Sequence, residues 1–137
     1  MMTEMIDRDA WYVVVNPASG AGRAARFRPH LVATLERARL PFHCVATAGP
    51  GHAERLFADA ARDGWRRLLA VGGDGTFNEL VNGLLGSGVE PRDCLVAAAA
   101  GGTGNDWSRA MDVPDDAGRL AACMARAASR PADIGIA

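Results

Sequence analysis

Apolar and polar positions alternate along the chain in blocks whose lengths fit short buried strands and longer helices. Four near-continuous apolar runs predict strands buried on both faces: Trp11–Asn16, Phe42–Thr47, Leu68–Gly72 and Cys94–Ala99. After each run, apolar residues recur every three or four positions, as on one face of a helix. This order of strands and helices predicts an α/β fold of three layers, in which helices cover both faces of a mostly parallel sheet.

Prolines, apolar spacing and polar residues predict where the expected helices begin, bend and are buried. The first covers about 21–39, and Pro29 inside it predicts a kink or a new helix start. The second is buried through Ala53, Leu56, Phe57 and Ala60, and a last one starts at Pro114. The third covers Thr76–Leu85, with an apolar face of Phe77, Leu80, Val81, Leu84 and Leu85. At its start, Thr76 and Glu79 have the spacing of a capping box, in which each side chain bonds to a backbone N–H of the first turn.

Short polar and glycine-rich segments follow the expected strands. They are Asn16–Arg23, Thr47–His52, Gly72–Thr76 and Gly101–Asp106. Because ligands bind outside the carboxyl ends of strands in open parallel sheets, all four segments belong to one candidate site. In the third segment, Asp74 lies between glycines at a helix start, where bare N–H groups favour phosphate. A carboxylate next to phosphate requires a metal ion or a proton, so this turn predicts a phosphoryl-transfer site.

Composition narrows the class of protein. The 137 residues (14.4 kDa) fit one domain with one core. A formal net charge of -1 and a pI near 6.3 argue against a nucleic-acid-binding protein. No segment approaches the ~20 apolar residues of a membrane span, and the first nine residues are too acidic for a signal peptide. Three isolated cysteines, Cys44, Cys94 and Cys123, indicate reduced thiols, and we expect a cytoplasmic protein.

All 15 basic residues are arginines. The absence of lysine excludes the lysine of a Walker A loop, the lysine of a protein-kinase strand and Schiff-base chemistry. Phosphate binding would therefore use backbone amides, helix dipoles and arginine. The cluster Arg23, Arg26 and Arg28 is interpreted first as a solvated helix face, with contact to anionic lipid headgroups as the alternative.

Three motifs together resemble the catalytic domain of the diacylglycerol kinase family, which includes bacterial lipid kinases and the sphingosine and ceramide kinases. They are Asn-Pro-Ala-Ser-Gly at 16–20, Gly-Gly-Asp-Gly-Thr-Phe-Asn-Glu at 72–79 and Gly-Thr-Gly-Asn-Asp at 102–106. The resemblance extends from about Trp11 to Pro131, whereas Gly-Gly-Asp-Gly alone is shared with NAD kinases and phosphofructokinases. It implies the fold of the NAD kinase and diacylglycerol kinase N-terminal domain. It also implies an ATP-dependent, Mg²⁺-requiring kinase that phosphorylates a lipid hydroxyl at a membrane surface, peripherally on the inner face.

The resemblance implies roles for individual residues. Asp74 would hold Mg²⁺ or act as a base, and Asp106 is the second catalytic candidate. Asn105 and Asp106 would orient the acceptor. The implied nucleotide-binding residues are Asn16, Pro17, Ala18, Ser19, Gly20, Thr47, Gly72, Gly73, Asp74, Gly75, Thr76, Glu79, Gly102 and Thr103.

The chain also departs from the family pattern. Ala21 replaces a lysine that some members have, and Ala100, Trp107 and Ser108 replace the usual proline, phenylalanine and alanine around the third motif. Residues 1–137 are expected to form the nucleotide-binding domain, with the family's β-rich C-terminal domain absent from this chain, so that lipid phosphorylation needs further sequence. A non-catalytic regulatory module and a soluble-substrate kinase of the NAD kinase type are the alternatives. The identity of the lipid and the formation of a homodimer stay open.

Overall fold

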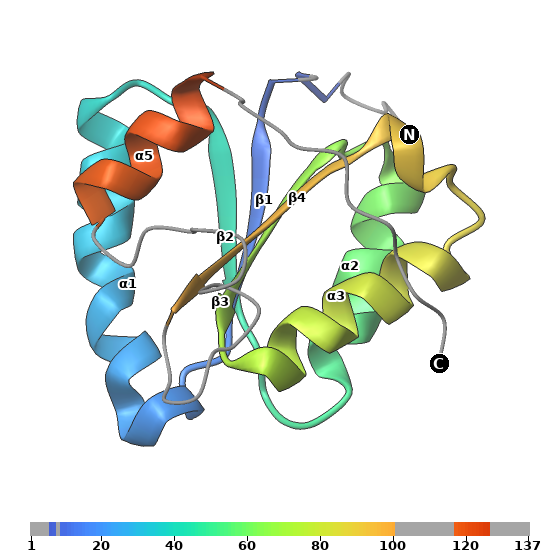
Figure 1. Cartoon of the computed structure of the whole chain (residues 1–137), viewed down its shortest axis with the longest axis horizontal. Coiled ribbons are helices and arrows are strands. Elements are labelled where there is room, and N and C mark those ends of the chain that lie inside the picture. The colour runs from blue at the N-terminus through green and yellow to red at the C-terminus, as the bar shows by residue number, and fades with distance from the viewer. Residues whose placement is uncertain (1–5, 8, 101–116, 127–137) are drawn as a thin grey trace, which may run out of the picture.

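The computed structural model describes residues 6, 7, 9–100 and 117–126. Its helices and strands follow one another in the predicted order (Figure 1). They are β1 (Trp11–Val15), α1 (Ser19–Arg37), β2 (Phe42–Ala46), α2 (His52–Asp63), β3 (Arg67–Gly72), α3 (Asp74–Gly86), the short 3₁₀ helix η1 (Pro91–Asp93), β4 (Leu95–Ala100) and α5 (Ala117–Arg126). The expected helix start at Pro114 lies outside the described residues.

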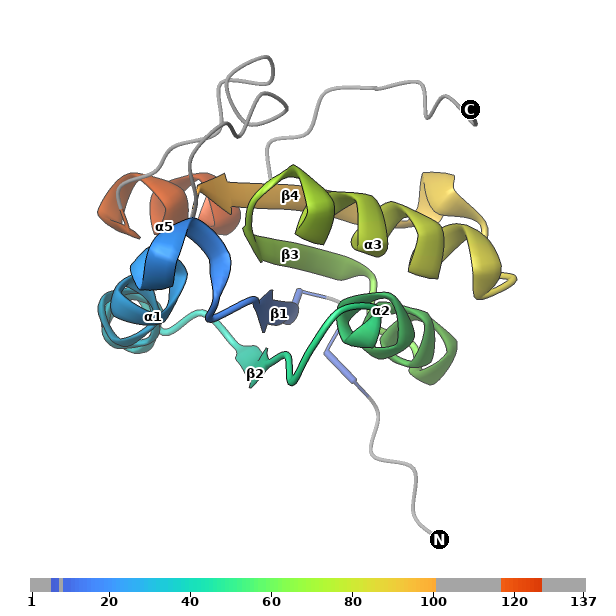
Figure 2. The same cartoon turned by 90° about the horizontal axis from the view of Figure 1, so that it is seen from below.

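The four strands form one parallel sheet in the order β2-β1-β3-β4. Helices α1 and α5 cover one face of this sheet, and α2 and α3 cover the other (Figures 1 and 2). The α/β prediction, with helices on both faces of a parallel sheet, is therefore confirmed.

The apolar runs of the strands contribute to two cores. Along β1, Trp11, Val13 and Val15 pack with α1 and α5, whereas Tyr12 and Val14 pack with α2 and α3. All five residues of β1 are buried. Each fully buried aliphatic or aromatic side chain contributes about 1.5–3 kcal/mol relative to an exposed one. Burial on both faces explains why the strand sequence shows no alternation of polar and apolar residues.

Helices α2 and α3 pack closely through a glycine. A Cβ atom at Gly83 would collide with the carbonyl oxygen of Glu54 and lie 3.1 Å from the backbone nitrogen of Ala58. Because α3 turns this small residue toward α2, its buried face is Thr76, Leu80, Gly83 and Leu84. Leu85 is 37% exposed, so the prediction that it belongs to the buried face was wrong.

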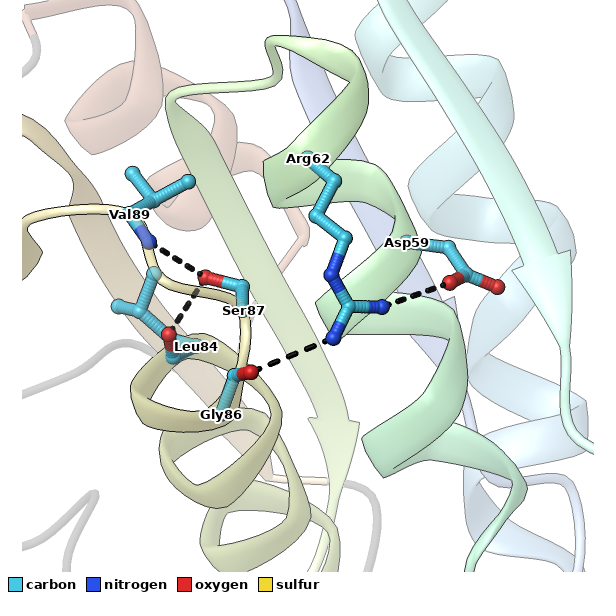
Figure 3. Close-up of polar contacts among 6 residues, drawn as sticks. All are labelled: Asp59, Arg62, Leu84, Gly86, Ser87 and Val89. Carbon is cyan, nitrogen blue, oxygen red and sulfur yellow. Dashed lines mark hydrogen bonds and ion pairs between the residues drawn. The ribbon is translucent and has the colours of Figure 1, made fainter.

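Polar contacts tie the ends of these two helices together (Figure 3). The Arg62 guanidinium donates from α2 to the carbonyl of Gly86 at 3.2 Å and pairs with Asp59 at 3.3 Å. The Ser87 hydroxyl donates to the carbonyl of Leu84 at 2.6 Å and accepts from the N–H of Val89 at 3.1 Å. The Arg62 bond gives the Gly86 carbonyl a donor at the end of α3, and the Ser87 hydroxyl is a second donor to the Leu84 carbonyl beside the N–H of Ser87 at 3.1 Å.

The start of α1 differs from the sequence prediction. Helical dihedral angles persist around Pro29, and the irregularity lies instead at Gly20, Ala21 and Gly22, whose φ values are 63°, 55° and 90°. The expected kink at Pro29 is therefore wrong. Proline removes only its bond to the carbonyl of Ala25, an exposed residue whose carbonyl water can solvate. Ala21 is a non-glycine residue in the left-handed region, which costs roughly 1–2 kcal/mol.

The three cysteines are free and half-buried. Burial raises the pKa of the Cys44 thiol, an effect partly opposed by the nearby Arg28 guanidinium. Burial likewise raises the pKa of Cys94, with Arg66 opposing it. A raised pKa reduces the thiolate fraction at neutral pH, which makes these two thiols poor nucleophiles. No helix among the described residues is long and apolar enough to cross a membrane.

The left-handed Ala21 leads to a stability prediction. Ala21→Gly should stabilise the fold by up to about 1 kcal/mol, because glycine adopts this conformation without the steric cost. Ala25→Gly is the matched control, since Ala25 is exposed within the regular part of α1, and it should destabilise by about 1 kcal/mol. Urea unfolding of both variants measures the difference. Equal destabilisation by the two substitutions would contradict the left-handed assignment.

Candidate functional site

A cavity of about 380 Å³ opens where β1, β2 and β3 end. Its volume lies within the range of about 300–1,000 Å³ that is usual for small-molecule sites. Three separate segments of the chain contribute lining residues: Asn16, Ala18, Ser19, Thr47, Gly49, Pro50, Ala53, Gly73, Gly75, Thr76 and Glu79. Three of the predicted strand-end segments therefore meet at one cavity.

The Asn16 side chain joins the ends of β1 and β3. Its backbone N–H donates to the carbonyl of Val71 at 2.9 Å, which extends the pairing of the two strands. Its side-chain Oδ1 accepts from the N–H of Ala18 at 3.2 Å, which forms an Asx turn. Its Nδ2 donates to Thr76 Oγ1 at 3.3 Å. Asn16 thus holds the segment after β1 against the first turn of α3.

Thr76 determines how α3 leaves the sheet. The residue is 3% exposed, the only buried polar residue in the described part of the chain. A Cβ atom at Gly72 would collide with its Oγ1 and lie 2.9 Å from its Cβ. Glycine at position 72 is therefore required by the packing of Thr76, which explains this residue without any ligand.

The next two glycines have a different environment. A Cβ atom at Gly73 would lie 3.5 Å from Ser19 Oγ, an ordinary contact, and one at Gly75 would have no atom within 4 Å. Gly73 precedes α3 and offers no side chain to cap it. The first turn of a helix leaves backbone N–H groups without intrahelical partners and has a partial positive charge. Around Gly75 this end of the helix is accessible to an anion.

The capping box predicted for Thr76 and Glu79 is wrong. Helix α3 begins at Asp74, two residues earlier than expected, so Thr76 lies inside the first turn instead of before it. The Glu79 side chain bonds to the neighbouring helix: its Oε1 accepts a 3.4 Å hydrogen bond from the N–H of Glu54 in the first turn of α2. Its carboxylate therefore complements the positive end of α2 and lines the cavity at the same time.

The segment between β2 and α2 completes the cavity wall. Thr47, whose N–H donates to the carbonyl of Val15 at 2.9 Å, lines the cavity. Gly49, Pro50 and Ala53 also line it. Gly49 and Pro50 belong to the expected Thr47–His52 segment, but none of the three residues was given an individual role. The sequence signal was the Gly49-Pro50-Gly51 turn directly after a strand. The His52 Nδ1 accepts from the N–H of Ala48 at 2.9 Å, which holds this turn closed.

Other predicted site residues lie elsewhere. Pro17, Gly20, Gly72 and Asp74 belong to the same turns but are absent from the cavity lining. Asp74 is exposed at the first position of α3. The residues predicted from the third motif lie outside the described residues: Gly102, Thr103, Asn105 and Asp106.

No group of three or more histidine, cysteine, aspartate or glutamate side chains in the described part of the chain could by itself hold a metal ion. Within this part of the chain, a metal ion at Asp74 would therefore take most of its ligands from a bound molecule or water. Mg²⁺ fits such a site, because it is usually held by one or two carboxylates together with phosphate oxygens and water.

Comparison with known proteins gives consistent results. The sequence profile of the diacylglycerol kinase catalytic domain matches residues 10–137. A diacylglycerol kinase of Bacillus subtilis (strain 168) is 34% identical over 127 residues, which are 90% of this chain and 40% of the relative. One from Staphylococcus carnosus (strain TM300) is 30% identical over 123 residues, 90% of this chain and 39% of the relative.

Comparison of the fold with solved structures also finds diacylglycerol kinases. A crystal structure of a diacylglycerol kinase from Bacillus anthracis str. Sterne superposes with a TM-score of 0.74 at 28% identity. The superposition covers 90% of this chain and 42% of that one. The chain thus spans about two fifths of the length of the relatives it matches.

The two glycine environments predict opposite responses to a methyl group. Gly72→Ala should destabilise the fold by about 2 kcal/mol or more, because the new Cβ collides with a buried side chain that has no room to move. Gly75→Ala should leave stability unchanged or raise it by up to about 1 kcal/mol, since alanine favours a helix and open space surrounds the position. Urea unfolding of the two variants tests this difference. Similar stabilities would show that Thr76 does not pack on Gly72.

Proposed function

The chain belongs to the diacylglycerol kinase catalytic-domain family, and we propose that it is the nucleotide-binding domain of an ATP-dependent lipid kinase. The observation that supports this most strongly is the cavity at the carboxyl ends of three parallel strands, with an accessible helix N-terminus at Gly73 and Gly75. ATP would bind there and donate its γ-phosphoryl group to the hydroxyl of a diacylglycerol-like or sphingoid lipid.

The charges around the cavity favour one orientation of ATP. The phosphates would lie near Gly73, Gly75 and Ser19, where the positive end of the α3 dipole stabilises negative charge. Glu79 lines the cavity with a carboxylate, which would repel phosphate. The nucleoside would therefore lie toward Glu79, with its base against Pro50 and Ala53. The Thr47 hydroxyl and the Glu79 carboxylate are the matching partners for sugar hydroxyls or base N–H groups.

Asp74 is the proposed Mg²⁺ ligand, directly or through water. It follows Gly73 at the start of α3, next to the proposed phosphates. The ion, when bound, would neutralise charge on the phosphate oxygens. Asp74 itself would orient the phosphates or, as the alternative role, accept the proton of the attacking hydroxyl.

The acceptor would be positioned from the third motif. We propose that Asn105 and Asp106 orient the lipid hydroxyl, with Asp106 as the second candidate base, because phosphoryl transfer depends mainly on holding donor and acceptor in line. Gly102 and Thr103 would contact the nucleotide. Pro17, Gly20 and Gly72 would contribute to nucleotide binding through the turns they form. A β-rich domain like that of the family would close the cleft against water, with the protein bound peripherally at the inner face of the membrane.

Nucleotide binding provides the direct test of the cavity. Mg-ADP should bind the 137-residue chain, and Asp74→Asn should weaken that binding by about tenfold, equivalent to about 1.4 kcal/mol. Without Mg²⁺, Asp74→Asn should bind ADP at least as tightly as the original chain, because a carboxylate that repels phosphate has been removed. Calorimetry with and without EDTA measures both effects. Asp63→Asn, the same charge change at the far end of α2, serves as the control and should alter neither.

A well-folded chain that binds no adenine nucleotide would refute the proposal. Equal weakening by Asp74→Asn with and without Mg²⁺ would assign Asp74 a role in folding or direct binding instead of metal binding.

Lipid phosphorylation is the second test. Transfer of radiolabelled phosphate from ATP to diacylglycerol, sphingosine or ceramide in mixed micelles should be weak or absent with the 137-residue chain alone. An open cleft gives water access to the γ-phosphoryl group and screens the charges that stabilise its transfer. In a protein extended to the length of its relatives, transfer to at least one lipid is expected, and Asp74→Asn or Asp106→Asn should abolish it. A full-length protein that binds Mg-ATP without any transfer would support a regulatory role.

A further inference from the structure

The two helix layers have opposite charge. Among the described residues, α1, the turn after it and α5 contain one carboxylate, Glu36, and seven arginines: Arg23, Arg26, Arg28, Arg37, Arg39, Arg119 and Arg126. Helices α2 and α3 contain two arginines, Arg55 and Arg62, and five carboxylates: Glu54, Asp59, Asp63, Asp74 and Glu79. The first layer thus has a formal charge of +6 and the second of -3, although the whole chain is nearly neutral at -1.

Most of the arginines point away from the sheet. Helix α1 buries Ala24, Leu31 and Leu35. At about 100° per residue, its exposed Arg26 and Arg37 lie on the opposite side, and the exposed Arg23 lies on the flank of the helix. Helix α5 in the same way buries Leu120, Ala121 and Met124 and exposes Arg119 and Arg126. The six exposed arginines of this layer are here called the arginine face: Arg23, Arg26, Arg37, Arg39, Arg119 and Arg126.

Five arginines of this face, Arg23, Arg26, Arg37, Arg39 and Arg126, have no carboxylate partner within the described part of the chain. The ion pairs found there join Arg62 to Asp59, Arg67 to Asp9 and Arg92 to Glu90, all of them outside α1 and α5. Three arginines of the face contact neutral groups instead. Arg26 donates to the carbonyl of Ala21 at 3.5 Å, Arg37 to the Thr34 hydroxyl at 3.2 Å and Arg126 to the Cys123 thiol at 3.6 Å. Their charge remains available to an external anion.

The sheet keeps the two charged layers apart. Figure 2 shows α1 and α5 on one side of the strands, with α2 and α3 on the other. A helix with its side chains is about 10 Å across, so the outer surfaces of the two layers are farther apart than the Debye length of about 8 Å at physiological salt. An extended anionic surface would therefore be attracted to one side of the molecule and repelled by the other.

We propose that the arginine face docks this domain onto an anionic lipid membrane. The inference rests on the proposed function, because a lipid kinase must reach a substrate that lies in a bilayer. Docking through α1 would bring the cavity close to the membrane, since α1 begins at Ser19, which lines the cavity. The Arg26 contact with the carbonyl of Ala21 links the face to the same segment.

The attachment is electrostatic. The one exposed large apolar residue in the described part of the chain is Leu85, which lies in α3 on the acidic side. The described residues therefore give the arginine face no apolar anchor, and binding through them depends on the charge of the lipids and on salt. Each arginine near an anionic membrane surface strengthens binding by roughly fivefold.

Sedimentation with lipid vesicles, without nucleotide, tests the proposal on the 137-residue chain. Vesicles of phosphatidylcholine mixed with phosphatidylglycerol should bind it at 50 mM salt and release it at 300 mM, and pure phosphatidylcholine should not bind it. The test variant is Arg37→Gln with Arg126→Gln, and the control is Arg55→Gln in α2 with Arg92→Gln in η1, both outside the arginine face. Both pairs lower the net charge by two. The test pair should weaken binding by at least tenfold, and the control pair by less than threefold.

Each other outcome overturns the proposal. Equal weakening by the two pairs would show a response to net charge without a docking face. Absence of binding at 50 mM salt would show that the face has no affinity for the membrane. Tighter binding to double-stranded DNA at the same phosphate concentration, lost in the test pair, would assign the face to nucleic acid. Calorimetry with Mg-ADP on the same variants keeps the two proposals separate, because nucleotide binding requires neither vesicles nor these arginines.

Discussion

The side chain of Thr76 packs directly on the backbone of Gly72, and the geometry of the candidate site depends on this contact. It brings the first turn of α3 against the end of β3 so closely that only glycine fits below it. The buried hydroxyl then accepts a hydrogen bond from Asn16, which fixes the end of the neighbouring strand β1. A helix N-terminus and two strand ends thus converge with one buried polar group among them. The open space at Gly75 is a consequence of this arrangement.

The packing of α2 against α3 positions the third segment that lines the cavity, which lies between β2 and α2. Gly83 allows the helices to approach until their backbones touch, and Arg62 fixes the far end of the pair. At the near end, Glu79 bonds to the first turn of α2. Close helix packing therefore positions Pro50 and Ala53, which precede and begin α2, opposite the glycines of α3. The cavity is a product of one rigid helix pair and two adjacent strands.

Much of the fold could be predicted because its strands are buried on both faces. Continuous apolar runs located β1 and β3 to within one residue at either end, and the strand-end motifs indicated the correct edge of the sheet. The start of α1 could not be predicted, because the spacing of apolar residues does not determine the left-handed dihedral angles of Gly20 to Gly22. The prediction of a capping box was wrong for a related reason. Thr76 and Glu79 have the right spacing, but their side chains accept hydrogen bonds from Asn16 and Glu54, which lie outside α3. Local spacing does not reveal whether a polar side chain will find a partner within its own helix or across the site.

The central claim is that the phosphates of a nucleotide bind at the N-terminus of α3. Amide NMR shifts of the isotopically labelled chain, followed during titration with Mg-ADP, test this claim residue by residue. The account predicts the largest changes at Gly73, Gly75 and Ser19, smaller ones at Thr47 and Glu79, and none in α5. Shifts concentrated on α5 and the outer side of α1, with Gly73 and Gly75 unchanged, would contradict it.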